Sequence, residues 1–183
     1  KNFAYVSVYK ATDAPENVAM LHAKAMFEAD LKKSGITYTI YRPTGYFYDI
    51  CKQFRPMIEE GKATLLGKEP ISCNVISTED FAQFIVKTMC DNNQMYDVGG
   101  KEVYTYDEIV TMMFEAAGKT GTITHAPIFL MKMIAFISHL TKNGKEAGVR
   151  FLIWCQTHSM VTDLKTGDMS FKQYIQDTFG GNK

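Results

Sequence analysis

The sequence predicts an α/β fold, made of the later strands of a parallel sheet and a small, mostly helical lobe. Two observations predict it. Strand-like and helix-like segments alternate from the first residues to about residue 100, which is typical of α/β domains. A strand, a helix and a second strand also follow one another within residues 3–41, and a crossover of this length joins parallel strands.

The first three elements form this crossover. Phe3–Val8 has β-branched and aromatic residues on both faces, which predicts a strand in the middle of a parallel sheet, buried on two sides. Glu16–Lys33 is a predicted helix that ends at Ser34-Gly35, and its apolar side consists of Val18, Leu21, Ala25, Met26 and Leu31. Ile36–Tyr41 is the next strand. We therefore expect these two strands to lie parallel, with the helix on one face.

The remaining elements continue the alternation and then become mostly helical. Four further strands are predicted, at Ala63–Leu66, Asn74–Ile76, Gln94–Val98 and Thr122–His125. Five predicted helices are Tyr48–Glu60, Thr78–Cys90, Pro127–Leu140, Lys145–Gln156 and Phe171–Thr178. One more is capped by Thr105, with Glu108 at the capping-box position, and runs to Ala117. We expect Gln94–Val98 to join the first sheet under helix Thr78–Cys90. The predicted units are residues 1–100, a partial sheet domain, and 101–183, a helical lobe with a C-terminal helix.

Composition narrows the function classes. Hydrophobic residues make up 46% of the 183, and the formal net charge is zero, so we expect a packed core and no nucleic-acid partner. The longest apolar run, Ile128–Ile137, is interrupted by Lys132 and is too short to span a bilayer, which predicts no membrane partner. The four cysteines are scattered, which favours reduced thiols, no metal site and a cytoplasmic location.

Two sets of residues are candidates for binding or catalysis. Ser7 lies near the carboxyl end of the first strand, where ligands bind in open α/β sheets, and Lys24 follows one helix later. A lysine beside a serine can orient a ribose and lower the pKa of a neighbouring hydroxyl. The alternative is a serine that caps a turn and a lysine in solvent.

The second set is the turn Arg42-Pro43-Thr44-Gly45, which follows the strand Ile36–Tyr41. Glycine in such a turn lets backbone N–H groups approach a bound ligand closely. A plain connection between a strand and a helix is the alternative. The segment Ser77-Thr78-Glu79-Asp80 is interpreted as a helix cap, with a structural role for Asp80 between the sheet and the lobe left open.

Four segments together resemble a known family. They are VSV at 6–8, LHAKAMFEADLKKSGITYTIYRPTGYF at 21–47, STEDFAQFIV at 77–86 and YDVGGKEVYTYDEI at 96–109. In this order and spacing they are similar to the atypical short-chain dehydrogenase/reductases, and especially to their NmrA-like branch. The C-terminal segment 157–179 is similar to the last helical region of that family. The resemblance implies the C-terminal half of a Rossmann-type sheet with a substrate lobe, and a glycine-rich first half expected before residue 1.

The resemblance also implies NAD or NADP as cofactor and a small molecule as substrate. Ser7 and Lys24 match the family's catalytic Ser and Lys, both of which also contact the cofactor, and Arg42, Pro43, Thr44 and Gly45 match the turn beside the nicotinamide. Tyr46 and Tyr48 are expected to contact substrate. The family's catalytic Tyr is replaced by Met20, which has no proton to donate; Tyr9, Tyr46 or Tyr48 could replace it.

Three functions remain open at this stage. The first is an NAD(P)-dependent oxidoreductase acting on a small molecule. The second is a non-catalytic NAD(P)-binding regulator or assembly factor, which Met20 favours. The third is an inactive fragment, because these residues contain no GxxGxxG loop to hold the pyrophosphate. The sequence does not decide between NAD and NADP and gives no oligomeric state.

Overall fold

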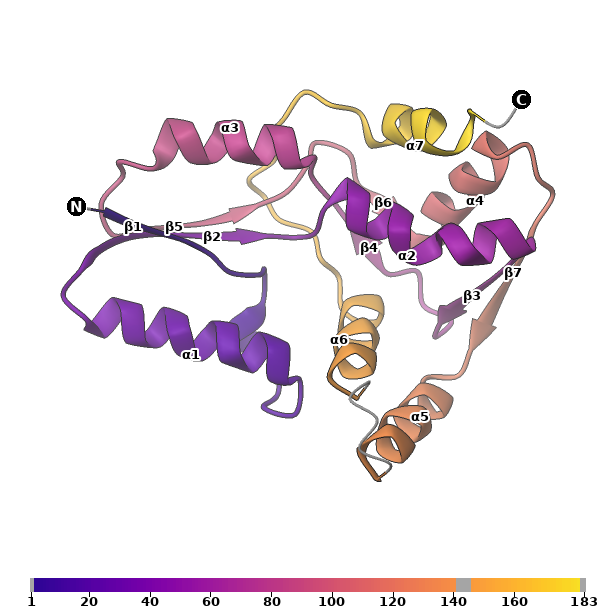
Figure 1. Ribbon diagram of the computed structural model, residues 1–183, viewed down its shortest axis with the longest axis horizontal. Coiled ribbons are helices and arrows are strands. Elements are labelled where there is room, and N and C mark those ends of the chain that lie inside the picture. Colours follow the sequence, from indigo (N-terminus) through magenta and orange to yellow (C-terminus); the bar gives the residue numbers. More distant parts are fainter. Residues whose placement is uncertain (1, 141–145, 182–183) are drawn as a thin grey trace.

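The computed structural model describes residues 2–140 and 146–181. A three-stranded parallel sheet lies at one end of the molecule, in the order β1 (Asn2–Val6), β2 (Thr37–Pro43) and β5 (Gln94–Val98). Helix α1 (Ala19–Lys33) covers one face and α3 (Thr78–Thr88) the other (Figure 1). The predicted crossover and the parallel pairing of these strands are therefore confirmed.

Strand β1 is partly exposed in this structure. Within the described residues it pairs with β2 alone, and Phe3 and Val6 are 43% and 37% exposed. The burial of a strand depends on its neighbours in the sheet as well as on its own apolar residues. Its predicted place in the middle of a sheet therefore stays a prediction.

Helix α1 also differs in two details. It begins at Ala19 and not at Glu16, since Pro15 starts a turn in which the Val18 N–H donates to the Pro15 carbonyl. Leu21 and Leu31 are buried as expected, but Met26 is 55% exposed. The buried face of the helix is therefore narrower than the apolar side predicted from its sequence.

The other end of the molecule is a lobe with its own apolar core, where Phe47 stacks on Phe171 with ring centroids 4.7 Å apart. Strands β3 and β7 pair in parallel, and the two-residue strands β4 and β6 pair antiparallel. The elements around this core are α2 (Phe47–Glu60), β3 (Lys62–Leu66), β4 (Ser72–Cys73), β6 (Tyr104–Thr105), α4 (Tyr106–Ala116), β7 (Thr122–Ala126) and α7 (Phe171–Phe179). Segments from both sides of residue 100 thus share one core, and the predicted domain boundary there stays a prediction.

Local signals in the lobe are largely confirmed. Thr105 and Glu108 form the predicted capping box at the start of α4, which satisfies two N–H groups of the first turn. The strand predicted at Asn74–Ile76 is wrong: the two-residue strand lies earlier, at Ser72–Cys73, and Ile76 forms an isolated bridge with Tyr46. The segment 74–76 instead belongs to the connection between β4 and α3.

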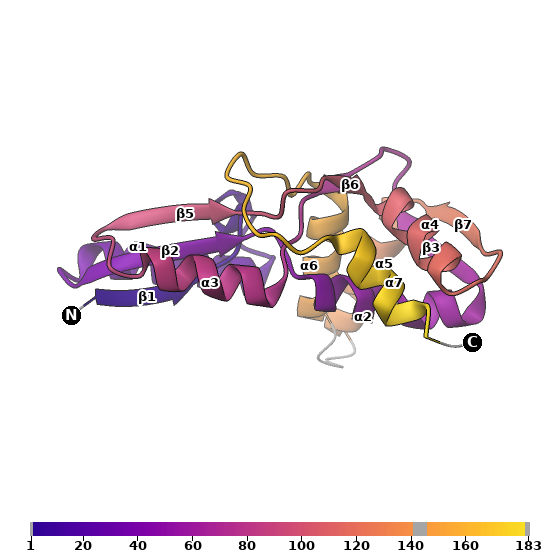
Figure 2. The ribbon, with the colours of Figure 1, turned by 90° about the horizontal axis from the view of Figure 1, so that it is seen from above.

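Helices α5 (Ile128–Leu140) and α6 (Glu146–Thr157) pack on each other, and α6 also contacts α1. Seen from above, these helices lie between the sheet and the lobe (Figure 2). The predicted helix Lys145–Gln156 begins at Lys145, which falls outside the described residues. Among the helices of 2–140 and 146–181, none is long and apolar enough to cross a membrane.

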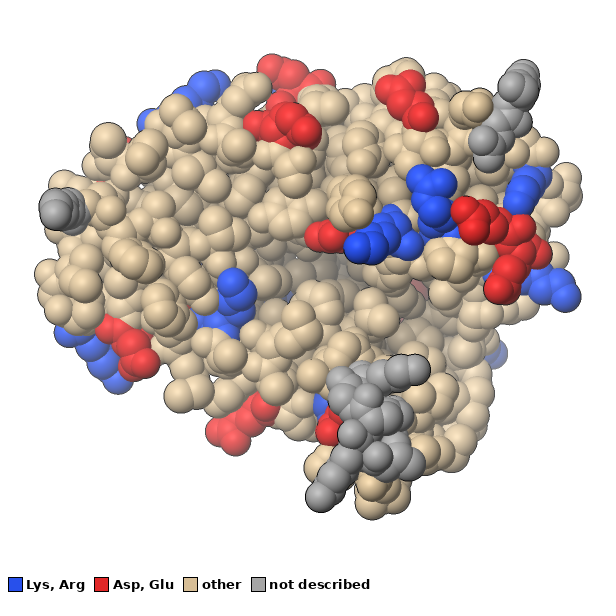
Figure 3. Space-filling model, viewed as in Figure 1, with Lys and Arg blue, Asp and Glu red and all other residues tan. Residues whose placement is uncertain are grey.

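Charge is distributed without a dominant sign on the visible face. Blue and red side chains alternate along its rim, and a broad uncharged area covers the sheet (Figure 3). The exposed fraction of several α5 side chains is large, up to 64% for Phe129 and Leu140. Helix α5 therefore exposes several large apolar side chains.

Candidate functional site

Lys24 lies at the carboxyl end of β1, beside the peptide bond that precedes Ser7. The Lys24 ammonium donates a 2.8 Å hydrogen bond to the Val6 carbonyl, which belongs to the peptide bond before Ser7. It also lies 5.0 Å from the centroid of the Tyr5 ring, within the range of a cation–π contact. The fold therefore places Lys24 beside the peptide bond that precedes Ser7 and adds Tyr5, which sequence reasoning missed. The catalytic role predicted for Ser7 and Lys24 stays a prediction.

The Ser7 hydroxyl lies on the inner side of this pair. The residue is 2% exposed, and within the described chain its Oγ makes no hydrogen bond of good geometry. It is nevertheless near enough to Glu28 to help lower the pKa of that carboxyl. A buried hydroxyl without a partner costs free energy, so Ser7 has an unused hydrogen-bonding capacity between α1 and the sheet.

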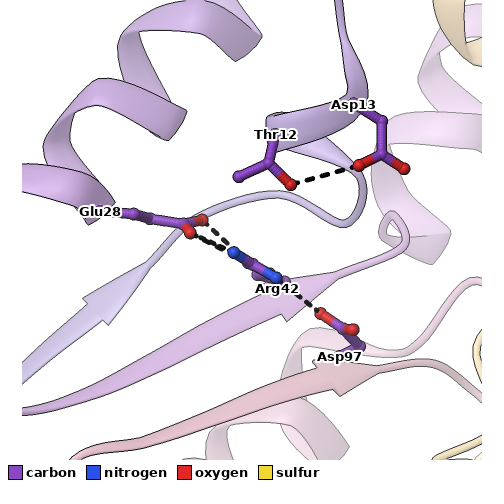
Figure 4. A network of polar contacts seen from close by, with 5 residues as sticks. All are labelled: Thr12, Asp13, Glu28, Arg42 and Asp97. Atoms are coloured by element: carbon purple, nitrogen blue, oxygen red, sulfur yellow. Dashed lines mark hydrogen bonds and ion pairs between the residues drawn. The ribbon is translucent and has the colours of Figure 1, made fainter. Parts of the chain in front are cut away.

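Glu28, one turn after Lys24 on α1, holds Arg42 of β2 (Figure 4). The Arg42 Nε donates to both carboxylate oxygens, at 3.0 and 3.1 Å, and one terminal nitrogen donates as well. Asp97, opposite Arg42 in the sheet register, lies 3.6 Å from the other terminal nitrogen. The guanidinium is therefore fixed inside the protein, which makes it a structural group in addition to any contact with a cofactor.

The pKa of Glu28 reflects two opposed effects. Burial alone would raise it, since the carboxyl is 1% exposed. The hydrogen bonds from Arg42, the nearby Ser7 hydroxyl and the charges of Arg42 and Lys32 outweigh burial, so the pKa lies below its usual 4.5. Glu28 is therefore a carboxylate at neutral pH, and Arg42 is its counter-ion.

The turn Pro43–Gly45 stands at the same edge of the sheet, but its polar groups serve the fold. The Thr44 N–H donates to the Val98 carbonyl at 3.1 Å, and its hydroxyl donates to the Asn74 carbonyl at 2.7 Å. The Gly45 carbonyl accepts from Ile76 at 3.0 Å. Gly45 has φ of 151°, and a Cβ there would lie 3.2 Å from Val75. The turn is thus rigid, and the Thr44 N–H is occupied within the protein.

Asn74 connects this turn to two other segments, and sequence reasoning missed it. The side chain is fully buried. Its amide donates to the carbonyls of Gly100 and Thr162, at 3.1 and 3.3 Å, and its oxygen accepts the Thr162 N–H at 3.1 Å. A Cβ on Gly99 would lie 2.3 Å from the Asn74 amide nitrogen. The Gly99-Gly100 pair was the only sequence signal for this close approach.

Asn74→Ala is expected to lower the free energy of unfolding by about 3 kcal/mol, because it leaves several buried backbone groups without partners. Urea unfolding followed by circular dichroism measures this change. Asn92→Ala, at an exposed turn, is the matched control and should change stability by less than about 0.5 kcal/mol. A loss at Asn74 as small as at Asn92 would mean that the network does not hold these loops.

The tyrosines that were predicted to contact substrate lie away from the Ser7–Lys24 pair. Tyr46 packs its ring against Phe81 of α3, on the opposite face of the sheet from α1, and burial raises its pKa to about 12. Tyr48 is 56% exposed and lies beside Lys52. Met20 is 50% exposed, one turn before Lys24 on α1. Their predicted roles stay predictions.

Asp80 has the structural role that the sequence left open. It is buried, and its carboxylate accepts the Met169 N–H at 3.0 Å. A Cβ on Gly167 would lie 2.6 Å from the same carboxylate. Asp80 thus fixes the segment that leads from α6 to α7, while Ser77 caps α3 as predicted.

The described residues fit one end of a nicotinamide nucleotide. Lys24 places an ammonium at the carboxyl end of a parallel strand, beside a rigid turn and an unpartnered buried hydroxyl, which suits the hydroxyls of a ribose. The sequence has no glycine loop for the pyrophosphate. The fit is therefore to the nicotinamide riboside and does not extend to the phosphates.

Comparisons with known proteins agree with this assignment of the fold. No family model matches the chain. Over 137 residues, 73% of the chain and 43% of the relative, it is 24% identical to photosystem II assembly factor Ycf39 of Trieres chinensis. Over 178 residues, 85% of the chain and 42% of the relative, it is 29% identical to the chloroplastic divinyl chlorophyllide a 8-vinyl-reductase of Arabidopsis thaliana. The chain thus spans about two fifths of the length of these curated relatives.

Among solved structures, an NADPH-dependent quinone oxidoreductase from Escherichia coli, complexed with NADPH, superposes with a TM-score of 0.78. The superposition covers 98% of this chain and 66% of the other, at 15% sequence identity. This likeness shows the fold, which is that of the Rossmann-type NAD(P)-binding reductases. The predicted fold class and the resemblance to the atypical short-chain dehydrogenase/reductases are confirmed.

Proposed function

We propose that this chain, an atypical short-chain dehydrogenase/reductase by sequence and fold, forms the nicotinamide-proximal and substrate-binding part of an NADPH-dependent reductase of small molecules. One observation carries the proposal: Lys24 is fixed 2.8 Å from the Val6 carbonyl at the carboxyl end of the sheet, beside Ser7. We name NADPH and not NADH in this proposal because the solved neighbour was crystallised with NADPH. When bound, the nucleotide supplies a hydride.

In this proposal the residues of the chain bind, orient and exclude water. Lys24 donates hydrogen bonds to the ribose hydroxyls from a position that the Val6 carbonyl fixes. The turn at Pro43–Gly45 is held by Val98 and Asn74, so it forms a rigid wall beside the nicotinamide. Preorganised groups of this kind lower the cost of reaching the reactive geometry.

Proton transfer in this proposal does not use position 20. A methionine thioether has no proton to donate, and the Met20 side chain is half-exposed. The proton comes from a water molecule that the Lys24 ammonium orients. This assignment does not use Tyr46 or Tyr48, which lie away from Ser7 and Lys24.

The test is nucleotide binding measured by calorimetry. The full-length protein is expected to bind NADPH in the micromolar range. A polypeptide of these 183 residues is expected to bind about 100-fold more weakly, because it has no glycine loop for the pyrophosphate. Equal affinity of the two polypeptides would contradict the role given to that loop. No binding by the full-length protein would reject the proposed function.

A second candidate is a non-catalytic, nucleotide-binding assembly factor. Two observations favour it: Met20 stands where the family has tyrosine, and several relatives carry the name of a photosystem II assembly factor. This candidate also requires NADPH to bind. It differs in that no substrate is reduced, so binding without NADPH oxidation across a panel of quinones and enones would favour it.

A further inference from the structure

A cavity of about 630 Å³ lies between the segment that leads into α1 and the helix pair α5–α6. This is the size of pockets that hold drug-sized molecules. Pro15, Asn17 and Val18 form one wall, ending two residues before Met20. The cavity is thus next to the start of the helix that carries Lys24. Sequence reasoning did not find it, because its walls come from three separated segments.

Most of the cavity wall is apolar. Phe136 and Ala135 contribute from α5 and Ile153 from α6. Trp154, also on α6, stacks its indole on the His158 ring with centroids 3.6 Å apart and planes inclined by 19°. The stack fixes the planes of both rings, and an aromatic wall favours a flat, largely apolar ligand.

Asn17, Thr157 and His158 are polar, and the charged side chains of the wall are cations. Lys132 lines it from α5 and Arg150 from α6, whereas no carboxylate occurs among the described lining residues. Arg150 donates its Nε–H to Glu146 at 2.8 Å, which offsets one positive charge. Lys132 remains as the surplus cation, on the same side of α5 as Phe136, four residues later.

We propose that this cavity binds a flat, largely apolar molecule with one anionic group, such as an aromatic carboxylate. Its rings lie against Trp154 and Phe136, and its anion lies between Lys132 and Arg150. The identification of this molecule as the substrate rests on the proposed function. The binding site itself rests on the cavity, its apolar walls and its two cations.

Two fluorescent probes test the proposal without nucleotide. Anilinonaphthalene sulfonate is flat, apolar and anionic, and phenylnaphthylamine has the same rings without the sulfonate. The chain is expected to bind the anionic probe about 10-fold more tightly, and Lys132→Met to remove most of that preference. Affinity for the neutral probe should change less than about twofold, because Met keeps the apolar stem.

Two control variants locate the probe. Lys172→Met removes an exposed cation of α7, outside the cavity lining, and should leave the preference unchanged. Phe129→Gln alters an exposed side chain of α5 that is also outside the lining, and it should leave both affinities unchanged.

Either of two results would overturn the proposal: equal affinities of the wild type for the two probes, or loss of binding in Phe129→Gln with none in Lys132→Met. Because no nucleotide is present, these outcomes are independent of whether the full-length protein binds NADPH. The probes can therefore refute ligand binding in the cavity without bearing on the reductase proposal.

Discussion

Replacing Arg42 by Met is expected to lower the free energy of unfolding by about 3–5 kcal/mol, because it leaves the Glu28 carboxylate buried without its counter-ion. Glu28 is 1% exposed and receives donors from Arg42 at 3.0 and 3.1 Å. Met fills much of the volume of the arginine stem, so the loss reports the charge and not a cavity. Urea unfolding of the 183-residue chain at neutral pH measures it.

Two variants separate the ion pair from general damage to the fold. Lys33→Met removes an exposed cation at the end of α1 and should cost less than about 0.5 kcal/mol. The double variant Glu28→Met with Arg42→Met should recover much of the loss, since apolar pairs often replace buried ion pairs without penalty. A double variant as unstable as Arg42→Met alone would mean that side-chain shape, and not unpaired charge, dominates.

The same ion pair predicts how stability depends on acid. The pKa of Glu28 is lower in the folded state than its usual 4.5, so the folded state binds this proton less readily than the unfolded chain. Its contribution is therefore complete above about pH 4.5 and is lost as the pH falls through the folded pKa. Glu28→Gln should flatten this part of the stability profile.

Lys24→Ala in the full-length protein is expected to reduce NADPH-dependent turnover by about 100-fold or more, whereas Met20→Leu should leave it within about twofold. Lys24 holds its ammonium 2.8 Å from the Val6 carbonyl, in the peptide bond before Ser7, and alanine removes that cation. Met20 is half-exposed, and Leu preserves its apolar character. Steady-state NADPH oxidation with a quinone acceptor gives both rates.

Folding controls accompany this comparison. Each variant is expected to keep the melting temperature of the wild type within a few degrees, since both side chains are at least partly exposed. Lys24→Arg retains the charge and should recover part of the activity. Turnover that is indifferent to both Lys24→Ala and Met20→Leu, with NADPH still bound, would contradict the reductase proposal and favour the assembly-factor candidate.

Much of the fold follows from local sequence. The crossover of the first three elements, the strand Gln94–Val98 and the capping box of Thr105 and Glu108 were predictable, because turns, caps and apolar periodicity act over a few residues. The position of Lys24 at the carboxyl end of β1 was predictable too. A helix that returns along a parallel strand brings residues of the two elements to the same end of the sheet.

Other features depend on residues that are distant in the sequence. The ion pair of Glu28 with Arg42 and the contacts of Asn74 with Thr162 join positions 14 and 88 residues apart, and no local pattern specifies such partners. The position of Tyr46 on the α3 face was decided in the same way.

The sequence by itself determined the class of fold, the order of its elements and the residues available for chemistry. The tertiary structure decided which of those residues are committed to holding the protein together. Arg42 and Thr44 are bound to other parts of the chain, while Lys24 remains beside an open strand end. The physical reason is that a buried charge or polar group must find a partner wherever the packing places one, and packing is a property of the whole fold.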